Sequence, residues 1–166
     1  FEGGVKHEYA PGLSARLELN PEVDGIWAFP GIGMGHGFNW TLGINRDIPI
    51  RMKVEAGAGE ALLDFSDTQV KDLRISTGAS STEVTLPARA GYTQVKIEAG
   101  VASVKVRIPQ GVAANIHMET GLSGKQVDTS RFPNIGGSDY RSADYETAVN
   151  RTDIRIEAGV GSIDIR

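Results

Sequence analysis

Apolar and polar residues alternate with a period of two along five stretches of the chain, and each stretch runs into a glycine. These glycines are Gly57, Gly78, Gly100, Gly121 and Gly159. The phrase IEAGVAS at 97–103 shows the pattern, and it nearly returns as IEAGVGS at 156–162. A period of two places alternate side chains on opposite faces of a β-strand, so each stretch predicts a strand with one buried face.

The apolar positions keep the same register in every stretch. Before the glycines the predicted inward positions are Met52, Val54 and Ala56; Leu73, Ile75 and Thr77; Val95, Ile97 and Ala99; Ile116, Met118 and Thr120; and Ile154, Ile156 and Ala158. A second alternating strand follows most of the glycines, as in Val104, Val106 and Ile108. We expect each glycine to make a tight bend between the two strands, because glycine adopts positive φ at little cost.

The spacing of the glycines predicts the fold class. Successive glycines are 21, 22, 21 and 38 residues apart, and a unit of about 21 residues cannot hold two parallel strands and a crossover helix. We therefore expect an all-β fold: a flattened, right-handed parallel β-solenoid with two strands per rung and rungs about 4.8 Å apart. An antiparallel β-sandwich is the alternative, since short strands with regular turns occur there too. The solenoid predicts that Ile75, Ile97 and Ile116 stack in one buried column.

The whole chain, 1–166, reads as a single β-repeat domain with interruptions. Its predicted parts are an N-terminal cap or linker (1–12), an irregular first rung (13–50) with a Gly-rich insertion (20–39), regular rungs (51–128), a second insertion (129–150) and a last rung (151–166). Lys125 falls where other rungs have Val104 or Ile163, so we expect the second strand of that rung to be short, bent or frayed. The last strand, SIDIR, ends the chain without a visible cap, which predicts a terminal edge open to self-association.

Composition excludes several classes of function. The net charge is −4 and no basic block occurs, so we expect no nucleic-acid partner. The absence of cysteine excludes disulfides and thiolate metal sites. No apolar run reaches the roughly 18 residues of a membrane helix, so we expect membrane attachment only through segments outside this chain. Neither a metal nor another cofactor is expected.

The outward positions form columns of like charge. Lys53, Arg74, Lys96, His117 and Arg155 make a basic column, and Glu55, Ser76, Glu98, Glu119 and Glu157 make the column beside it. A solvated sheet face with opposite charges offset along and across strands is one interpretation. A charged binding face for an envelope polymer or a partner protein is the other. His117 lies in the basic column, so a structural surface role is expected for it.

Aromatic residues in the two insertions are the candidate interaction surface. These residues are Trp27, Phe29 and His36 around GIGMGHG (31–37), with Tyr140 and Tyr145 in the second insertion. GIGMGHG lacks the third glycine of a dinucleotide-binding loop and the Gly-Lys-Ser/Thr of a phosphate-binding loop. We therefore interpret it as a surface loop, whose flanking aromatics either pack over the sheet or contact a sugar ring, a lipid surface or a partner.

The chain shows no arrangement typical of an enzyme. A carbohydrate-active β-helix enzyme needs two positioned carboxylates. The acidic candidates are Asp64, Asp128, Asp139, Asp144 and Glu146, and none has an obvious base, nucleophile or metal cluster beside it. We expect no catalytic residues, and a carbohydrate-active enzyme is kept as a remote alternative.

Four longer phrases resemble a known family. They are VEAGAGEALLDFSD, LRISTGASSTEVTLP, VKIEAGVASVKVRIPQGVAA and DYRSADYETAVNRTDIRIEAGVGSIDI. They resemble the C-terminal domain of LiaF-like, cell-wall-active antibiotic response proteins, which is grouped with the bacterial toastrack, or adhesin-like, β-repeat domains. The resemblance covers residues 40–166 and carries over no catalytic residue. It implies a β-repeat domain that is joined to membrane segments and linked to envelope-stress signalling.

Together these observations predict a non-enzymatic interaction or scaffold module of the bacterial cell envelope, in stress sensing or signalling. Its expected location is membrane-associated or extracytoplasmic, and its expected partner is a protein or an envelope polymer. The alternative is an extracellular adhesin or a self-assembling surface subunit that associates through terminal rung edges.

Overall fold

The computed structural model describes residues 5–10, 14–19 and 43–166. The chain forms two compact units, Phe1–Thr41 and Leu42–Arg166. In the first unit, strand β1 (Val5–Ala10) pairs antiparallel with β2 (Ser14–Leu19), so that Val5 lies opposite Leu19. The rung expected over 13–50 and the Gly-rich insertion lie largely outside the described residues, so this division of the chain stays a prediction.

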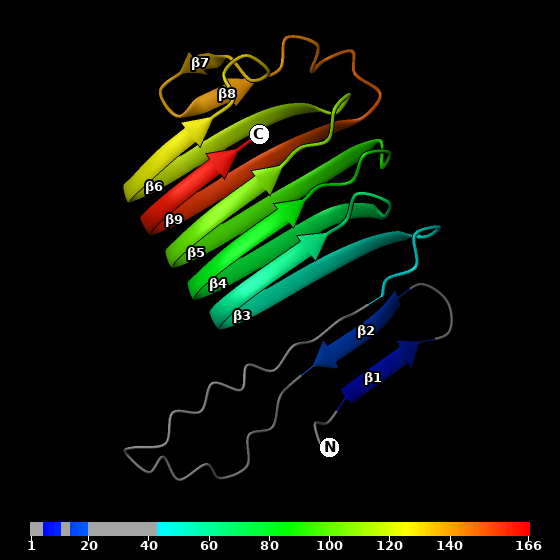
Figure 1. Cartoon of the computed structure of the whole chain (residues 1–166). Coiled ribbons are helices and arrows are strands. Elements are labelled where there is room, and N and C mark those ends of the chain that lie inside the picture. Colours follow the sequence, from blue (N-terminus) through cyan, green and yellow to red (C-terminus); the bar gives the residue numbers. More distant parts are fainter. Residues whose placement is uncertain (1–4, 11–13, 20–42) are drawn as a thin grey trace, which may run out of the picture. The chain divides into compact units, whose positions relative to one another are not determined.

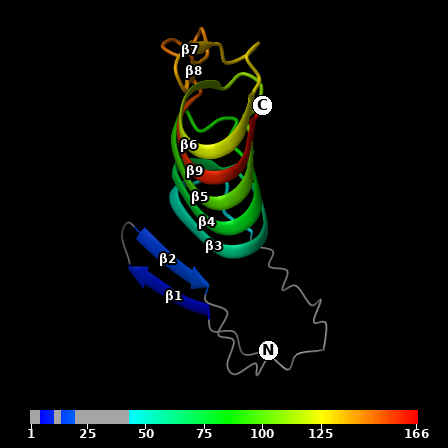
Figure 2. The same cartoon turned by 90° about the vertical axis from the view of Figure 1, so that its left-hand side faces the viewer.

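The second unit is built on five long strands that run parallel to one another. They are β3 (Pro49–Asp64), β4 (Gln69–Thr85), β5 (Tyr92–Arg107), β6 (Ala113–Val127) and β9 (Arg151–Ile165). Each strand bends near its middle into an arch, and the arches stack on one another (Figure 1, Figure 2). One bent strand is thus one rung of two straight halves. The parallel ladder confirms the expected β-solenoid and excludes the antiparallel sandwich.

The apolar columns form the core of the stack. Leu73, Val95, Ile154 and Ile116 occupy one column, and Ile75, Ile97, Ile156 and Met118 occupy the next. All eight side chains are at most 3% exposed. The predicted pairing of Ile75 with Ile97 is confirmed, but the placement of Ile116 in their column is wrong. Ile116 pairs with Ile154, one column away, because Met118 is the residue of its strand that aligns with Ile156.

The last strand of the chain lies inside the stack. The order is β3-β4-β5-β9-β6, so β9 separates two rungs that are consecutive in sequence. Both edges of β9 are therefore paired, one with β5 and one with β6. The expectation that SIDIR leaves an open terminal edge is wrong, because the chain returns from its insertion to fill the space between β5 and β6.

The insertion at 129–150 folds over the end rung. Its strands β7 (Asn134–Gly136) and β8 (Asp139–Arg141) form a hairpin, and β8 pairs antiparallel with β6 at Asn115–His117 (Figure 1). Phe132 is fully buried at 0% exposed and joins the core cluster. The insertion thus covers the first half of β6 and shields core side chains at that end.

Lys125 does not shorten its strand. It pairs in register with Ile163, and β6 continues to Val127, so the predicted fraying is wrong. β6 is the outermost long strand on this side, where an inward-column side chain can reach solvent. Lys125 is exposed there, and its Nζ donates to Ser138 Oγ at 3.0 Å. A charged residue in the inward column of an edge strand discourages pairing with another chain.

The recurring glycines have a different role from the expected one. None of the five has positive φ; that conformation occurs at other glycines, such as Gly59 and Gly161. A Cβ added at Gly78 would lie 2.4 Å from the carbonyl oxygen of Gly57, and one at Gly159 would lie 2.8 Å from that of Gly100. Gly78, Gly121 and Gly159 leave no room for a Cβ because the backbones of stacked rungs approach closely at the bend, whereas Gly57, on the outermost rung, has open space.

Candidate functional site

A column of aliphatic residues lies exposed at the bend of the solenoid. We call it the aliphatic ridge, and it consists of Ala58, Ala79, Val101, Val160 and Leu122, in register across the five rungs. Val101 is 64% exposed, Val160 46% and Leu122 84%. Strict alternation stops at the glycine, since Gly100 and Val101 are both exposed between buried Ala99 and Ala102. The bend therefore turns one aliphatic side chain per rung toward solvent.

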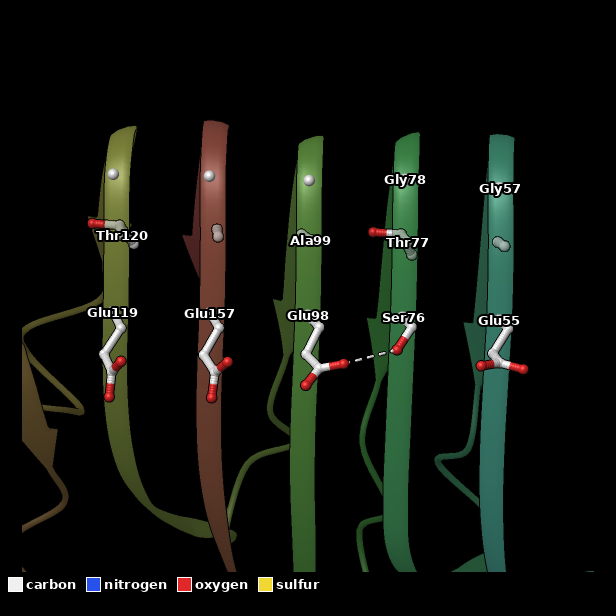
Figure 3. Close-up of a pocket in the computed structure, with 15 residues that line it drawn as sticks. Glu55, Gly57, Ser76, Thr77, Gly78, Glu98, Ala99, Glu119, Thr120 and Glu157 are labelled. Carbon is white, nitrogen blue, oxygen red and sulfur yellow. Dashed lines mark hydrogen bonds between the residues drawn. The ribbon is translucent and has the colours of Figure 1, made fainter.

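A groove runs beside the ridge across all five rungs. Its volume is about 870 Å³, and its length is about 19 Å for five rungs at the usual strand spacing. The glycines form one part of its lining, and a row of outward polar residues forms another (Figure 3). We call this row the acidic row, and it consists of Glu55, Ser76, Glu98, Glu157 and Glu119.

Ion pairs within and between rungs connect the acidic row to the predicted basic column. Lys96 Nζ lies 2.6 Å from Glu98 Oε1 and 3.4 Å from Glu157 Oε1. Arg155 likewise reaches Glu157 at 3.1 Å and Glu119 at 2.5 Å. Each cation thus joins its own rung to the next, which confirms the expected offset of opposite charges along and across strands. Exposed ion pairs contribute little stability individually, but they hold the carboxylates in a row.

These contacts favour the ionised form of Glu98. The hydrogen bond from Lys96, with a second from Ser76 Oγ at 3.1 Å, holds the pKa of Glu98 below its usual range. The side chains of the row remain accessible: those of Glu55, Glu98 and Glu119 are 67%, 50% and 54% exposed. The site therefore offers fixed negative charge beside an apolar surface.

His117 connects the acidic row to the insertion. Its Nδ1 lies 2.5 Å from Asp139 Oδ1 on β8, and its Nε2 lies 3.1 Å from Glu119 Oε1. The hydrogen bonds to Asp139 and then to Glu119 raise the pKa of His117 above its usual value. His117 pairs in register with Arg155, as the basic column predicted.

The tyrosines predicted as interaction residues pack against the solenoid. Tyr145 is 9% exposed, and its hydroxyl donates to Asp153 Oδ1 at 2.7 Å. Tyr140 is half-buried against the core and pairs with Ile116 across the β6–β8 ladder. Burial, and then the hydrogen bond to Asp153, raise the pKa of Tyr145. Tyr145 thus fastens the insertion to β9, and a binding role for either tyrosine stays a prediction.

Asp153 gathers several of these contacts. It accepts hydrogen bonds from Tyr92, Tyr145 and Asn115. Burial by itself would raise the pKa of Asp153, but these hydrogen bonds outweigh it and leave the pKa lowered. A carboxylate held ionised by three donors is a structural anchor for the insertion. Trp27, Phe29 and His36, the other predicted interaction residues, lie outside the described residues.

The acidic residues considered for carbohydrate chemistry are engaged separately. Asp64 and Asp128 accept hydrogen bonds from the backbone N–H groups of Ser66 and Ser130, as turn caps at equivalent strand ends. In the insertion, the carboxylate of Asp139 contacts His117 and that of Glu146 contacts Arg141 at 3.3 Å. Asp144 accepts hydrogen bonds from the N–H groups of Thr147 and Ala148 through its backbone carbonyl, not through its carboxylate. Within the described ranges, no group of three or more His, Asp or Glu residues is placed to hold a metal ion.

The aliphatic ridge was missed in the sequence. Its signal was present as an apolar residue directly after each recurring glycine. Alternation continued from the first strand places that residue inward, whereas alternation continued back from the second strand places the following residue inward instead. In the part of the chain that the structure describes, no helix is long and apolar enough to cross a membrane.

Comparison with known proteins supports the fold and the domain type. A family model described as the N-terminal domain of toast_rack, DUF2154, matches residues 27–107. None of the curated proteins shows significant sequence similarity to the chain. The match confirms the predicted resemblance to toastrack domains over the N-terminal rungs of the solenoid.

A crystal structure from Clostridium sporogenes ATCC 15579 has the same fold. The protein is named a "putative cell adhesion protein", and it is similar to this chain with a TM-score of 0.84 at 25% sequence identity. The similarity covers 99% of this chain and 76% of that chain. The match therefore includes the stacked rungs of the second unit.

Proposed function

Starting from a toast-rack-like domain folded as a β-solenoid, we propose that the protein is a non-enzymatic interaction or scaffold module of the bacterial cell envelope. The family match and the Clostridium sporogenes structure both support a module of this general kind. Within this role, the sequence resemblance to LiaF-like proteins favours stress sensing or signalling. We place the module in the envelope, outside the cytoplasm or attached to the membrane through segments other than those in this chain.

One observation carries the proposal: the long outward surface at the bend, where the aliphatic ridge and the acidic row repeat across five rungs. A stack of parallel strands holds such a surface rigidly, because every rung is hydrogen-bonded to its neighbours. A preorganised surface binds with little ordering cost. Four of the five acidic residues considered for carbohydrate chemistry are instead engaged in ion pairs and turn caps.

Cell adhesion is a second candidate, and the name of the Clostridium sporogenes protein favours it. An adhesin presents its binding surface to the outside of the cell, whereas an internal envelope module meets its partner only within the envelope. The two differ in whether intact cells can bind the purified protein.

Co-sedimentation tests the proposal. The purified chain is mixed with isolated envelopes of the bacterium that produces it, with the same envelopes after protease treatment, and with intact cells. An unrelated acidic protein of similar size and net charge is the control. We expect saturable pelleting with envelopes above the control, and loss after protease treatment identifies a protein partner. Pelleting with intact cells favours adhesion. Pelleting no stronger than the control's in all three mixtures would reject both candidates.

A further inference from the structure

The aliphatic ridge is more apolar than the fold requires. The same column holds Ala58 and Ala79 in two rungs but Val101, Val160 and Leu122 in the other three. Two rungs stack with alanine at this position, so packing between rungs does not require the larger side chains. Stacked neighbours bury part of Val160, which is 46% exposed, but they cover little of Leu122 at 84%. A contiguous exposed apolar patch rimmed by polar groups is typical of an interaction site.

The charges beside the ridge indicate the partner's sign. The carboxylates of Glu98 and Glu157 lie next to the glycine strip, and their cationic partners lie two residues farther from the ridge along each strand. An ionised carboxylate offers about four acceptor sites. Among the described residues, both ion-pair contacts of Glu119 use Oε1, so its second oxygen can accept from a partner. A ligand over the ridge therefore meets carboxylate oxygens first.

The dimensions indicate the partner's shape. The ridge repeats about every 4.8 Å, close to the 5.4 Å pitch of an α-helix. Over about 19 Å, a helix of about 13 residues makes about three and a half turns and would place about four aliphatic side chains along the five rungs. The neighbouring turn positions of that helix would face the acidic row. Anionic lipid headgroups have the wrong charge for this rim.

We propose that the aliphatic ridge and the acidic row together dock an amphipathic α-helix of a partner protein, one that carries an aliphatic stripe beside a row of Lys or Arg. This inference rests on the proposed role as an interaction module and identifies the surface and the chemistry of its partner. The aliphatic side chains pack on the ridge, and the basic side chains bind the carboxylates.

A pair of synthetic peptides tests the proposed chemistry. One is a Leu/Lys amphipathic peptide of about 18 residues, long enough to span the ridge as a helix, and the other is the same pattern with Glu in place of Lys. Binding of each labelled peptide is followed by fluorescence anisotropy. We expect the Leu/Lys peptide to bind at least about tenfold more tightly than the Leu/Glu peptide, with an affinity that falls as salt is raised.

Matched variants locate the binding. The double variant Val101→Ser with Leu122→Ser, the ridge variant, removes the two most exposed large side chains of the ridge. The matched variant, Val149→Ser with Leu62→Ser, removes a Val and a Leu that are 84% and 77% exposed elsewhere. We expect the ridge variant to weaken binding of the Leu/Lys peptide about tenfold or more and the matched variant to leave it unchanged. Glu98→Gln should also weaken binding and reduce its salt dependence. All these positions are exposed, and circular dichroism verifies that each variant is folded.

Several results would overturn the inference. They are equal binding of the two peptides, binding of neither, and equal losses in the ridge and matched variants. Ridge-dependent binding to phosphatidylglycerol vesicles would assign the ridge to a lipid surface instead, and a dimer in sedimentation velocity that disappears with the ridge variant would assign it to a second copy.

The envelope assay separates this inference from the proposed function. If the ridge variant pellets with envelopes as well as the wild type does, the module function stands and the ridge is not its surface. If neither pellets, the proposed function fails whatever the peptides do.

Discussion

Substitution of Gly78 by alanine tests why glycine recurs at the bend. In the folded chain the new Cβ would lie 2.4 Å from the carbonyl oxygen of Gly57 on β3. That oxygen belongs to backbone held in the parallel ladder, so it cannot rotate away as a flexible side chain would. A normal contact of about 3.5 Å would require β3 and β4 to separate by about 1 Å at the bend. The hydrogen bonds between these rungs would lengthen as a result.

Overpacking of this kind costs about 1–3 kcal/mol. We therefore expect Gly78→Ala to lower the free energy of unfolding by about 2 kcal/mol and the Tm by about 4–8 °C. Urea denaturation followed by circular dichroism gives the free energy, and a thermal scan gives the Tm.

Gly57→Ala is the matched control. It lies in the same column, has no positive φ, and among the described residues no atom lies within 4 Å of its added Cβ. Alanine there should be neutral or stabilise by up to about 1 kcal/mol, because it restricts the unfolded chain. If both variants lose the same stability, close stacking is not the reason for glycine, and the conformation of the bend itself would be the cause.

Three further substitutions test the insertion at 129–150 and the end of the stack. Protonated His117 binds Asp139, and this contact raises the pKa of His117. Its contribution to stability is therefore complete below about pH 6.5 and is lost as pH rises through the folded pKa. The Tm difference between wild type and His117→Gln should shrink over that range, and a difference independent of pH would contradict this. Tyr145→Phe removes the hydrogen bond to Asp153, which should lower the free energy of unfolding by about 1.5–3 kcal/mol and speed amide exchange in 129–150. Unchanged exchange there would show that this hydrogen bond does not hold the insertion. Lys125→Val completes the apolar column at the end rung and removes a charge that protects the edge of β6. Sedimentation velocity should therefore detect self-association of this variant. A variant that stays monomeric at high concentration would show that Lys125 does not protect the edge.

Much of the fold could be read from the alternation of residues. The period of two assigned Ile97 and Ala99 to the core and Glu98 to the outward face, and the structure places them there. The columns of charge followed from the same register. The reason for the recurring glycine could not be read from the sequence. A sequence shows that a residue is small, but it does not show whether a positive φ or a neighbouring backbone requires it.

The candidate site was less predictable. The acidic row was recognised as a column, but the aliphatic ridge was not, since an apolar residue such as Val101 reads as core until the bend is seen. Lys125 seemed to interrupt its strand because its column is otherwise apolar. On β6, the end rung of the stack, however, an inward-column side chain can reach solvent.

The sequence by itself determined the rungs and their register, because side-chain alternation and the repeated glycine fix which residues face inward. It did not determine the order of the rungs. Every rung presents nearly the same columns, so almost any rung can pair with any other. Only the tertiary structure places β9 between β5 and β6 and folds the insertion over β6. The near-identity of IEAGVAS and IEAGVGS, which made the repeat easy to find, is also the match that allows those two strands to lie side by side.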